Sequence, residues 1–214
     1  MPKPSIVVLI DGSNLYHAVK AQTGKTFDRA KFEALFLKIQ ERHDITEIRF
    51  YDAVKDRLKD PAGYAKQQKF HAELGKIRPT VRLRHRKLRY LANLTQDQVL
   101  REAKSVGIID TCKNKLWNLL HKLRLVRLTK EKGVDVLLVV DAVELARAKA
   151  AQCICLVTGD ADFTPAVELI RSMKIKTLNL HTYSGSSTEL RQACDEHALI
   201  QFDGLGNPSI NWYD

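Results

Sequence analysis

Four aspartates of this 214-residue sequence occupy positions from which acidic side chains commonly do chemistry. Asp11 follows the apolar run SIVVLI, and Asp160 and Asp162 follow the apolar run CICLVT in the motif TGDADF. Such runs are typical of strands buried in a parallel sheet, and ligands bind these sheets beside the carboxyl ends of the strands. We therefore expect the three carboxylates to share one crevice. Asp135 joins them if residues 134–149 form a helix that begins there.

Carboxylates held this close repel one another, and each raises the pKa of its neighbours unless a cation lies between them. Mg²⁺ or Mn²⁺ suits an all-oxygen site with few protein ligands, whereas Zn²⁺ favours His or Cys. The sequence thus predicts a site for Mg²⁺ or Mn²⁺ formed by Asp11, Asp135, Asp160 and Asp162. For any one of them, the alternative is an ordinary helix cap or turn residue.

Strands and helices alternate along the chain, which predicts an α/β fold with a central parallel sheet and helices on both faces. Residues 134–149 begin like a strand, but their valines recur at helical spacing and favour a helix. The expected strands are 5–10, 45–54, 153–158, 176–181 and 198–202, with 80–88 extended. The expected helices are 28–43, 61–75, 134–149, 165–173 and 187–197, with two more at 96–105 and 112–123.

Charge is distributed unevenly over the chain, whose formal net charge is +10. Residues 55–132 hold 21 Lys or Arg against 7 Asp or Glu, whereas the rest of the chain holds 14 against 18. A basic segment in an otherwise acidic chain is typical of a protein that binds a phosphate backbone. If 80–88 is a strand, its alternate arginines form one row; a solvated charged face is the simpler alternative. The predicted RNA contacts are Arg82, Arg84, Arg86, Lys87, Arg89, Lys122, Arg124, Arg127 and Lys132.

Three motifs, in this order, give the sequence a resemblance to a known family. They are VVLIDGSNLYH at 7–17, EKGVDVLLVVDAV at 131–143 and LVTGDADFTPAVELIRSMKIKTL at 156–178, supported by SSTELRQACDEHALIQF at 186–202. With these motifs the chain resembles the NYN domain family of PIN-like, metal-dependent ribonucleases. The resemblance implies a PIN-like, Rossmann-like α/β sheet. It also implies cleavage of RNA, in regions that are single-stranded, by a Mg²⁺- or Mn²⁺-dependent endoribonuclease.

The resemblance assigns roles to individual residues. It makes Asp11, Asp135, Asp160 and Asp162 the metal ligands and catalytic acids, and it adds Asn14 as a residue that orients the site. Two further acids also match recurrent family positions. We expect Asp141 to be structural, because it lies about 600° around the helix from Asp135, and Asp195 to tie the last helix to the sheet. A further family acid has three candidates here, Asp52, Asp56 and Asp110.

We expect one NYN, PIN-like domain over 1–204, with a basic insertion at about 82–130 and a turn-rich, loosely attached C-terminal tail at 205–214. The apolar run near the start is too short for a signal peptide, and none approaches the roughly 18 to 20 residues of a membrane span. The four cysteines form no pair of zinc-binding pairs. A cytoplasmic protein without membrane contact is expected. A homodimer is compatible with the sequence.

Two other functions remain open at this point. One is a non-catalytic PIN-like module that binds RNA or a protein; the intact acids argue against it. The other is a small-molecule phosphohydrolase, but haloacid dehalogenase-like enzymes carry a second Asp where this sequence has Ser13. DNA as the substrate is also compatible with the motifs, since none of them recognises a 2′ hydroxyl.

Overall fold

The structure, a computed structural model, describes residues 2–93, 96–108, 110–122, 127–130 and 133–213. The chain forms two compact units, one made of Met1–Arg86 with Gly133–Asp214 and the other of Lys87–Lys132. The predicted insertion at about 82–130 overlaps the second unit, but its first residues belong to a strand of the first. No helix of the described residues is long and apolar enough to cross a membrane.

A seven-stranded sheet forms the centre of the first unit, in the order β3-β2-β1-β6-β7-β8-β9. β1 pairs in parallel with β2 and β6, the pairs β6–β7 and β7–β8 are also parallel, and β9 is antiparallel to β8. The prediction of an α/β fold with a central, mostly parallel sheet is confirmed. The strands are β1 (Ser5–Asp11), β2 (Asp44–Val54), β3 (Val81–Lys87), β6 (Cys153–Val157), β7 (Lys176–Thr182), β8 (Glu196–Phe202) and β9 (Pro208–Trp212).

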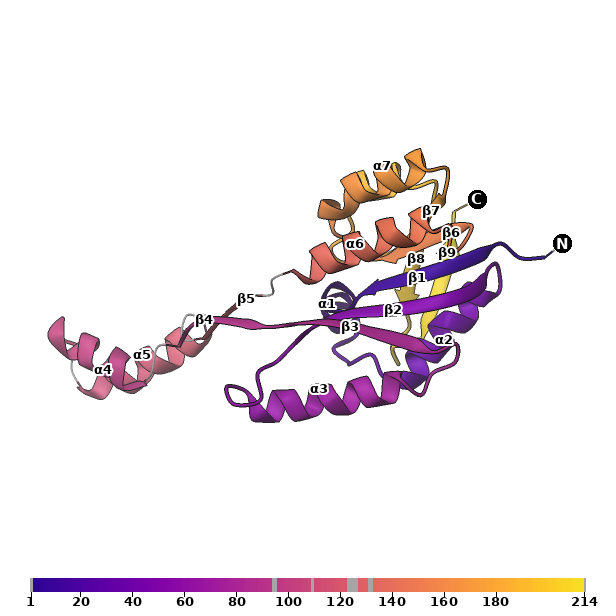
Figure 1. The fold of residues 1–214 in the computed structure, drawn as a ribbon. Coiled ribbons are helices and arrows are strands. Elements are labelled where there is room, and N and C mark those ends of the chain that lie inside the picture. Colours follow the sequence, from indigo (N-terminus) through magenta and orange to yellow (C-terminus); the bar gives the residue numbers. More distant parts are fainter. Residues whose placement is uncertain (1, 94–95, 109, 123–126, 131–132, 214) are drawn as a thin grey trace. The chain divides into compact units, whose positions relative to one another are not determined.

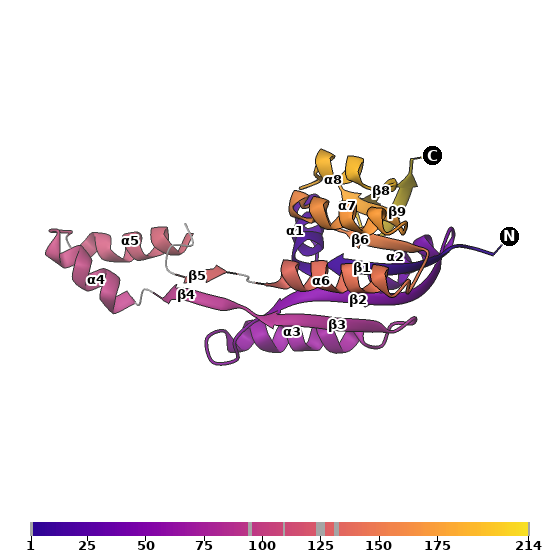
Figure 2. The same ribbon diagram turned by 45° about the horizontal axis from the view of Figure 1, so that its top comes forward.

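Helices cover both faces of this sheet, as Figures 1 and 2 show: α6 and α7 lie on one face, and α2 and α3 on the other. The first helix of the chain, α1, directly follows β1 and was not among the predicted helices. The helices are α1 (Gly12–Thr23), α2 (Arg29–Gln40), α3 (Pro61–Leu74), α6 (Val134–Arg147), α7 (Thr164–Ser172) and α8 (Thr188–Ala193), with a 3-10 turn η1 at Ala161–Phe163.

β1 is buried on both faces, as its uninterrupted apolar sequence predicts. Ile6, Val8 and Ile10 belong to a core cluster that includes Phe32 and Phe36 of α2. Full burial of each such side chain stabilises the fold by about 1.5–3 kcal/mol. The end of β1 is therefore held firmly in place, and with it the residue that follows the apolar run.

α6 confirms that residues 134–149 are helical. Its buried positions Leu138, Ala142 and Leu145 recur every three or four residues, which is the pattern of a helix packed by one face. Gly133 precedes the helix in a left-handed conformation with φ 84°, which a residue with a side chain rarely adopts. Val136 and Val140 are themselves exposed, so the face that packs consists mainly of other residues of the helix.

Two boundaries near the C-terminus differ from the prediction. The helix expected at 187–197 ends at Ala193, because Cys194 is already extended and β8 starts at Glu196. The expectation of a loosely attached tail was wrong, because β9 is hydrogen-bonded to β8. Trp212 packs against the core cluster, and the guanidinium of Arg42 lies 5.0 Å from its ring centroid.

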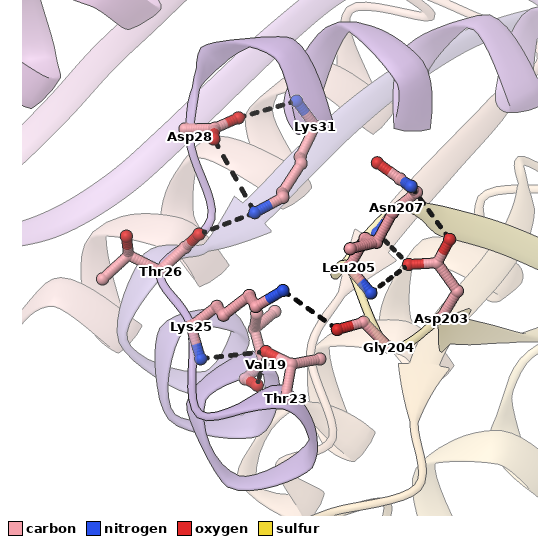
Figure 3. A network of polar contacts seen from close by, with 10 residues as sticks. All are labelled: Val19, Thr23, Lys25, Thr26, Asp28, Lys31, Asp203, Gly204, Leu205 and Asn207. Atoms are coloured by element: carbon pink, nitrogen blue, oxygen red, sulfur yellow. Dashed lines mark hydrogen bonds and ion pairs between the residues drawn. The ribbon is translucent and has the colours of Figure 1, made fainter.

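A network of polar contacts, shown in Figure 3, connects the α1–α2 loop to the turn between β8 and β9. Lys25 Nζ donates to the carbonyl of Gly204 at 3.0 Å, which joins segments far apart in the sequence. Asp203 organises the turn, since its carboxylate accepts from the backbone N–H groups of Leu205 and Asn207, both at 2.8 Å. This turn lets β9 return beside β8. Within the α1–α2 loop, Asp28 caps α2 by accepting from Lys31 N at 3.1 Å.

In its described residues, the second unit has a two-stranded antiparallel ribbon and two helices. Its helices match the two expected at 96–105 and 112–123, whereas the ribbon was not predicted. Val99 and Ala103 are buried on one face of the first helix, so that helix is amphipathic. The elements are β4 (Arg89–Asn93), α4 (Gln96–Ser105), α5 (Asp110–Lys122) and β5 (Arg127–Lys130).

Candidate functional site

Asp11 is the last residue of β1 and the N-cap of α1. Its Oδ1 accepts from the backbone N–H of Asn14 at 3.0 Å, and its Oδ2 accepts from the hydroxyl of Thr158, after β6, at 3.0 Å. The chain passes from β1 to β2 on one side, whereas β6 adjoins β1 on the other side. Asp11 thus lies where the strand order reverses, which is the usual place for a ligand in an open α/β sheet.

Asn14 connects the first turn of α1 to the loop after β6. Its side-chain oxygen accepts from the backbone N–H of Gly159 at 3.1 Å. Gly159 has no room for a side chain, because an added Cβ would collide with the carbonyl group of Gly185. The loop that carries the next two acids is therefore fixed on both sides.

Asp160 and Asp162 follow in this loop, and Asp160 caps the short turn η1. Its Oδ1 accepts from the backbone N–H of Asp162 at 3.0 Å, while its own N–H donates to the hydroxyl of Thr158 at 3.3 Å. Asp11 and Asp160 are therefore both helix caps, as the simpler alternative proposed. Capping occupies only one oxygen of each carboxylate, so it does not exclude a second role.

Asp135, in the first turn of α6, lies close enough to the loop acids to be repelled by them. Burial raises its pKa, and the negative charges of Asp160 and Asp162 raise it further. For Asp11, burial is the largest cause of a pKa raised to about 6; repulsion from Asp135 and Asp160 adds to it, and the hydrogen bonds from Asn14 and Thr158 oppose it. The fold thus brings the four predicted acids into one electrostatically coupled group.

The chemistry of this donor set fits a hard divalent cation. Among the residues that the structure describes, no three His, Cys, Asp or Glu side chains are grouped so that together they could hold a metal ion. Mg²⁺ does not require such a cage, since it usually keeps several waters and uses one or two carboxylates. Coupled carboxylates with raised pKa values are the kind of ligands that such an ion stabilises.

The row of arginines on β3 is present, but its members differ in their contacts. Arg84 donates to both carboxylate oxygens of Asp141, at 2.7 and 2.8 Å, and Arg82 pairs with Glu47 at 3.1 Å. An internal carboxylate thus occupies the guanidinium of Arg84, whose role as an RNA contact stays a prediction. Arg86 is exposed and lines, with Leu83, Arg84, His85 and Leu137, an open pocket of about 250 Å³.

The other predicted RNA contacts are spread over the basic segment. Lys87 is exposed at the end of β3, and Lys122 is exposed at the end of α5. Arg89 and Arg127 are on the ribbon of the second unit. Arg124 and Lys132 lie outside the described residues.

Asp141 is surrounded by Tyr51 and Arg49 on β2, which were not predicted, and by Arg84 on β3, which was predicted to contact RNA. A pattern that could have revealed them is the alternation of polar residues Glu47, Arg49 and Tyr51 with the apolar residues of β2. Asp195 does tie the segment after α8 to the sheet, as expected: its Oδ2 accepts from both the backbone N–H and the hydroxyl of Thr177, each at 2.9 Å.

The first unit is thus an α/β domain with a mostly parallel sheet and carboxylates at its switch point. The chain belongs to the NYN domain family, which it matches over residues 5–201, nearly its whole length. Members of this family are generally PIN-like nuclease domains. The resemblance drawn from the three motifs is confirmed.

A solved structure with a similar fold is that of a protein of unknown function from Vibrio parahaemolyticus. It is 22% identical, the match covers 93% of this chain and 94% of that one, and the TM-score is 0.58. This likeness establishes the fold alone. The uncharacterized protein y4oD of Sinorhizobium fredii is 38% identical over 69 residues, which make up 31% of this chain and 32% of that protein. The chain therefore matches about a third of that relative's length.

Proposed function

We propose that this protein is a metal-dependent ribonuclease that hydrolyses phosphodiester bonds of RNA, as an endoribonuclease. The observation that carries the proposal is the coupled group of Asp11, Asp135, Asp160 and Asp162 at the switch point of a NYN domain. Burial and mutual repulsion raise the pKa of Asp11 to about 6, so its carboxylate is stabilised only weakly by the protein itself. A bound cation would supply the missing stabilisation.

The four aspartates would hold Mg²⁺ or Mn²⁺. When bound, the ion lowers the pKa of a water molecule and offsets the charge that develops on the phosphate. The hydroxyl of Thr158 orients Asp11, and Asn14 holds the loop of Asp160 in place through the N–H of Gly159. In this mechanism water would attack the phosphorus in line and the 3′ oxygen would leave, so we expect products with a 5′ phosphate and a 3′ hydroxyl.

The basic residues would supply the path for a single-stranded RNA backbone. Arg84 is held by Asp141, whereas Arg82 is exposed although it pairs with Glu47. The exposed candidates on β3 are therefore Arg82, Arg86 and Lys87. The other proposed contacts, Lys122, Arg124, Arg127, Arg89 and Lys132, fall in the sequence range of the second unit. Each lysine or arginine that neutralises a phosphate steepens the dependence of binding on salt, so a plot of log affinity against log salt would count these contacts.

A reducing compartment such as the cytoplasm fits the cysteines. All four are free thiols, and only Cys112 is exposed. Burial raises the pKa of both Cys153 and Cys194 to about 12, which keeps them protonated and unreactive.

Replacing Asp160 by Asn tests the proposal, because Asn caps a helix about as well as Asp and should preserve η1. We expect Asp160→Asn to abolish Mg²⁺-dependent cleavage of single-stranded RNA and to leave RNA binding nearly intact. Asp28→Asn is the matched control, since it removes the same charge from the cap of α2. Cleavage by Asp160→Asn at the rate of the control would refute the role of the acids. RNA binding without cleavage by the unaltered protein would identify a binding module instead.

A further inference from the structure

Asp141, in the middle of α6, is a buried carboxylate surrounded by donors. Only 2% of its side chain is exposed. Arg84 reaches both of its oxygens, Tyr51 donates its hydroxyl to Oδ2 at 2.9 Å, and Arg49 Nη1 lies 3.1 Å from the same oxygen. Bidentate contacts between arginine and carboxylate are geometrically specific, since two parallel bonds fix the orientation of both groups.

Glu47 extends this arrangement along the sheet. It accepts from Arg49 Nε at 2.8 Å and lies 3.1 Å from Arg82 Nη1. Arg82 and Arg84 alternate on β3 as Glu47, Arg49 and Tyr51 do on β2, so one face of both strands presents polar groups to α6. We name Asp141, Tyr51, Arg49, Arg84 and Glu47 the Asp141 cluster.

The cluster is charged in the folded protein. Burial alone would raise the pKa of Asp141, but the hydrogen bonds from Arg84, Tyr51 and Arg49 outweigh it and lower the pKa. For Tyr51, burial and the adjacent Asp141 raise the pKa, so its hydroxyl keeps the proton that it donates. The contacts are therefore those of a carboxylate with two guanidinium groups and a phenol.

Two connections lead from this cluster to the candidate active site. Asp135 lies six residues before Asp141 on the same helix, about 9 Å along its axis. Tyr51 is the register partner of Asp11 in the pairing of β2 with β1. The Tyr51–Asp141 hydrogen bond thus joins α6, which carries Asp135, to β2, which pairs with the strand that ends at Asp11.

Apolar packing alone would hold α6 less specifically. Leu138 and Ala142 face the sheet, and contacts of this kind tolerate small rotations and slides of a helix. Hydrogen bonds with fixed directions do not. In the sequence, the two elements that carry Arg84 and Asp141 flank the second unit. β3 ends at Lys87, where that unit begins, and α6 starts just after Lys132, where it ends.

We propose that the Asp141 cluster is a positioning device that holds Asp135 in register with Asp11, and that Arg84 acts through Asp141 and not on the RNA. The proposal rests on the proposed function, because the residues it positions are the metal ligands of that function. It assigns different roles to two arginines on the same face of one strand. Arg84 positions the site, and Arg86 contacts the substrate.

Steady-state kinetics on single-stranded RNA separates these roles. Arg84 acts on Asp135 only through Asp141 and α6, so we expect Arg84→Gln to lower kcat by about 10-fold and to change KM less than about twofold. Arg86→Gln should instead act mainly on KM. Arg147→Gln, at the exposed end of α6, is the matched control for lost charge. An Arg84→Gln variant that raises KM at unchanged kcat would make Arg84 an RNA contact and overturn the proposal.

A second set of measurements does not depend on cleavage. Titration with Mn²⁺ should show weaker binding to Arg84→Gln and to Tyr51→Phe, by about 10-fold, than to Arg147→Gln. Tyr51→Phe removes a single hydroxyl, so it tests the cluster even if Arg84→Gln does not fold. Arg84→Lys should restore part of the affinity, since it keeps the charge and loses the bidentate geometry.

The two proposals fail in different ways. If the unaltered protein binds Mn²⁺ and does not cut RNA, the proposed function fails, while the Mn²⁺ titration still tests the positioning role. If it cuts RNA and all cluster variants keep the Mn²⁺ affinity and kcat of the control, the positioning role is refuted and the ribonuclease proposal stands.

Discussion

Replacing Asp141 by Asn keeps the size of the buried side chain and removes its charge. Three hydrogen bonds from guanidinium groups reach this carboxylate, two from Arg84 and one from Arg49, and Tyr51 adds a neutral one. An amide offers one acceptor oxygen in place of two. Its NH₂ group would face the N–H groups of an arginine, so at least one of the guanidinium bonds is lost outright.

The expected destabilisation follows from these contacts. A hydrogen bond to a charged group contributes about 1.5–3 kcal/mol, and a neutral one contributes about 0.5–1.5 kcal/mol. When Asn replaces the charged Asp141, the three bonds from guanidinium groups together lose roughly 3 kcal/mol. The side chain of Arg84 is 42% exposed, and water replaces part of what it loses. We therefore expect Asp141→Asn to lower the free energy of unfolding by about 2 kcal/mol at neutral pH, below the 3–5 kcal/mol typical of a fully buried pair that loses one partner.

Urea unfolding followed by circular dichroism measures this difference, and its pH dependence tests the cause. The pKa of Asp141 is lowered in the folded state, so its contribution is present above the unfolded pKa of about 3.9 and is lost as the pH falls through the folded value. The gap between the two proteins should close in acid. A gap below about 0.5 kcal/mol at neutral pH, or one that persists unchanged at low pH, would refute the charged cluster.

Three further predictions concern single residues. Hydrogen bonds from Thr177 outweigh the effect of burial and lower the pKa of Asp195. Asp195→Asn should therefore lower the free energy of unfolding by about 1 kcal/mol at pH 7, and by progressively less as the pH falls through that pKa. Urea midpoints measure this difference. Gly159→Ala should lower the melting temperature by several degrees, because its Cβ would meet backbone; Gly204→Ala, with nothing within 4 Å of the added Cβ, is the control. Burial lowers the pKa of His181 to about 4, so the folded state resists protonation, and stability should fall by up to about 3 kcal/mol as the pH drops from 6.5 to 4. This pH slope should shrink in His181→Leu.

The position of the candidate site could be predicted because it depends on local signals. An apolar run of five or six residues identifies a buried strand, and the carboxyl ends of parallel strands meet at one edge of the sheet. The approach of Thr158 to Asp11 follows from that geometry. The start of α6 could be predicted for a similar reason, since Gly133 and the helical spacing of its valines are both local.

The roles of the arginines on β3 could not be predicted in this way. Alternation along a strand shows which side chains share a face, but it does not show what packs on that face. Arg84 meets Asp141, which is 57 residues later in the sequence. That contact depends on β3 lying beside β2 at the edge of the sheet, and strand order is not encoded in any short stretch of sequence.

The boundary after α8 shows the same limitation. The segment ACDEH at 193–197 has the composition of a helix end, yet Asp195 is held by Thr177 of β7 and the chain becomes a strand. β9 likewise forms because Asp203 organises the preceding turn and β8 offers an unpaired edge. After α8 the contact that overrides the local preference is distant in sequence, whereas the turn and pairing that form β9 join neighbouring segments.

α6 carries two aspartates on one helix in opposite electrostatic situations, and this contrast separates their roles. The charge of Asp141 is compensated inside the protein by Arg84 and Arg49, and its pKa is lowered. Asp135 meets Asp160 and Asp162, and its pKa is raised. A carboxylate stabilised by built-in cations contributes to the fold at neutral pH, whereas repelling carboxylates destabilise it until something positive binds. Retaining them at the switch point of the sheet makes physical sense if the compensating charge comes from outside the chain.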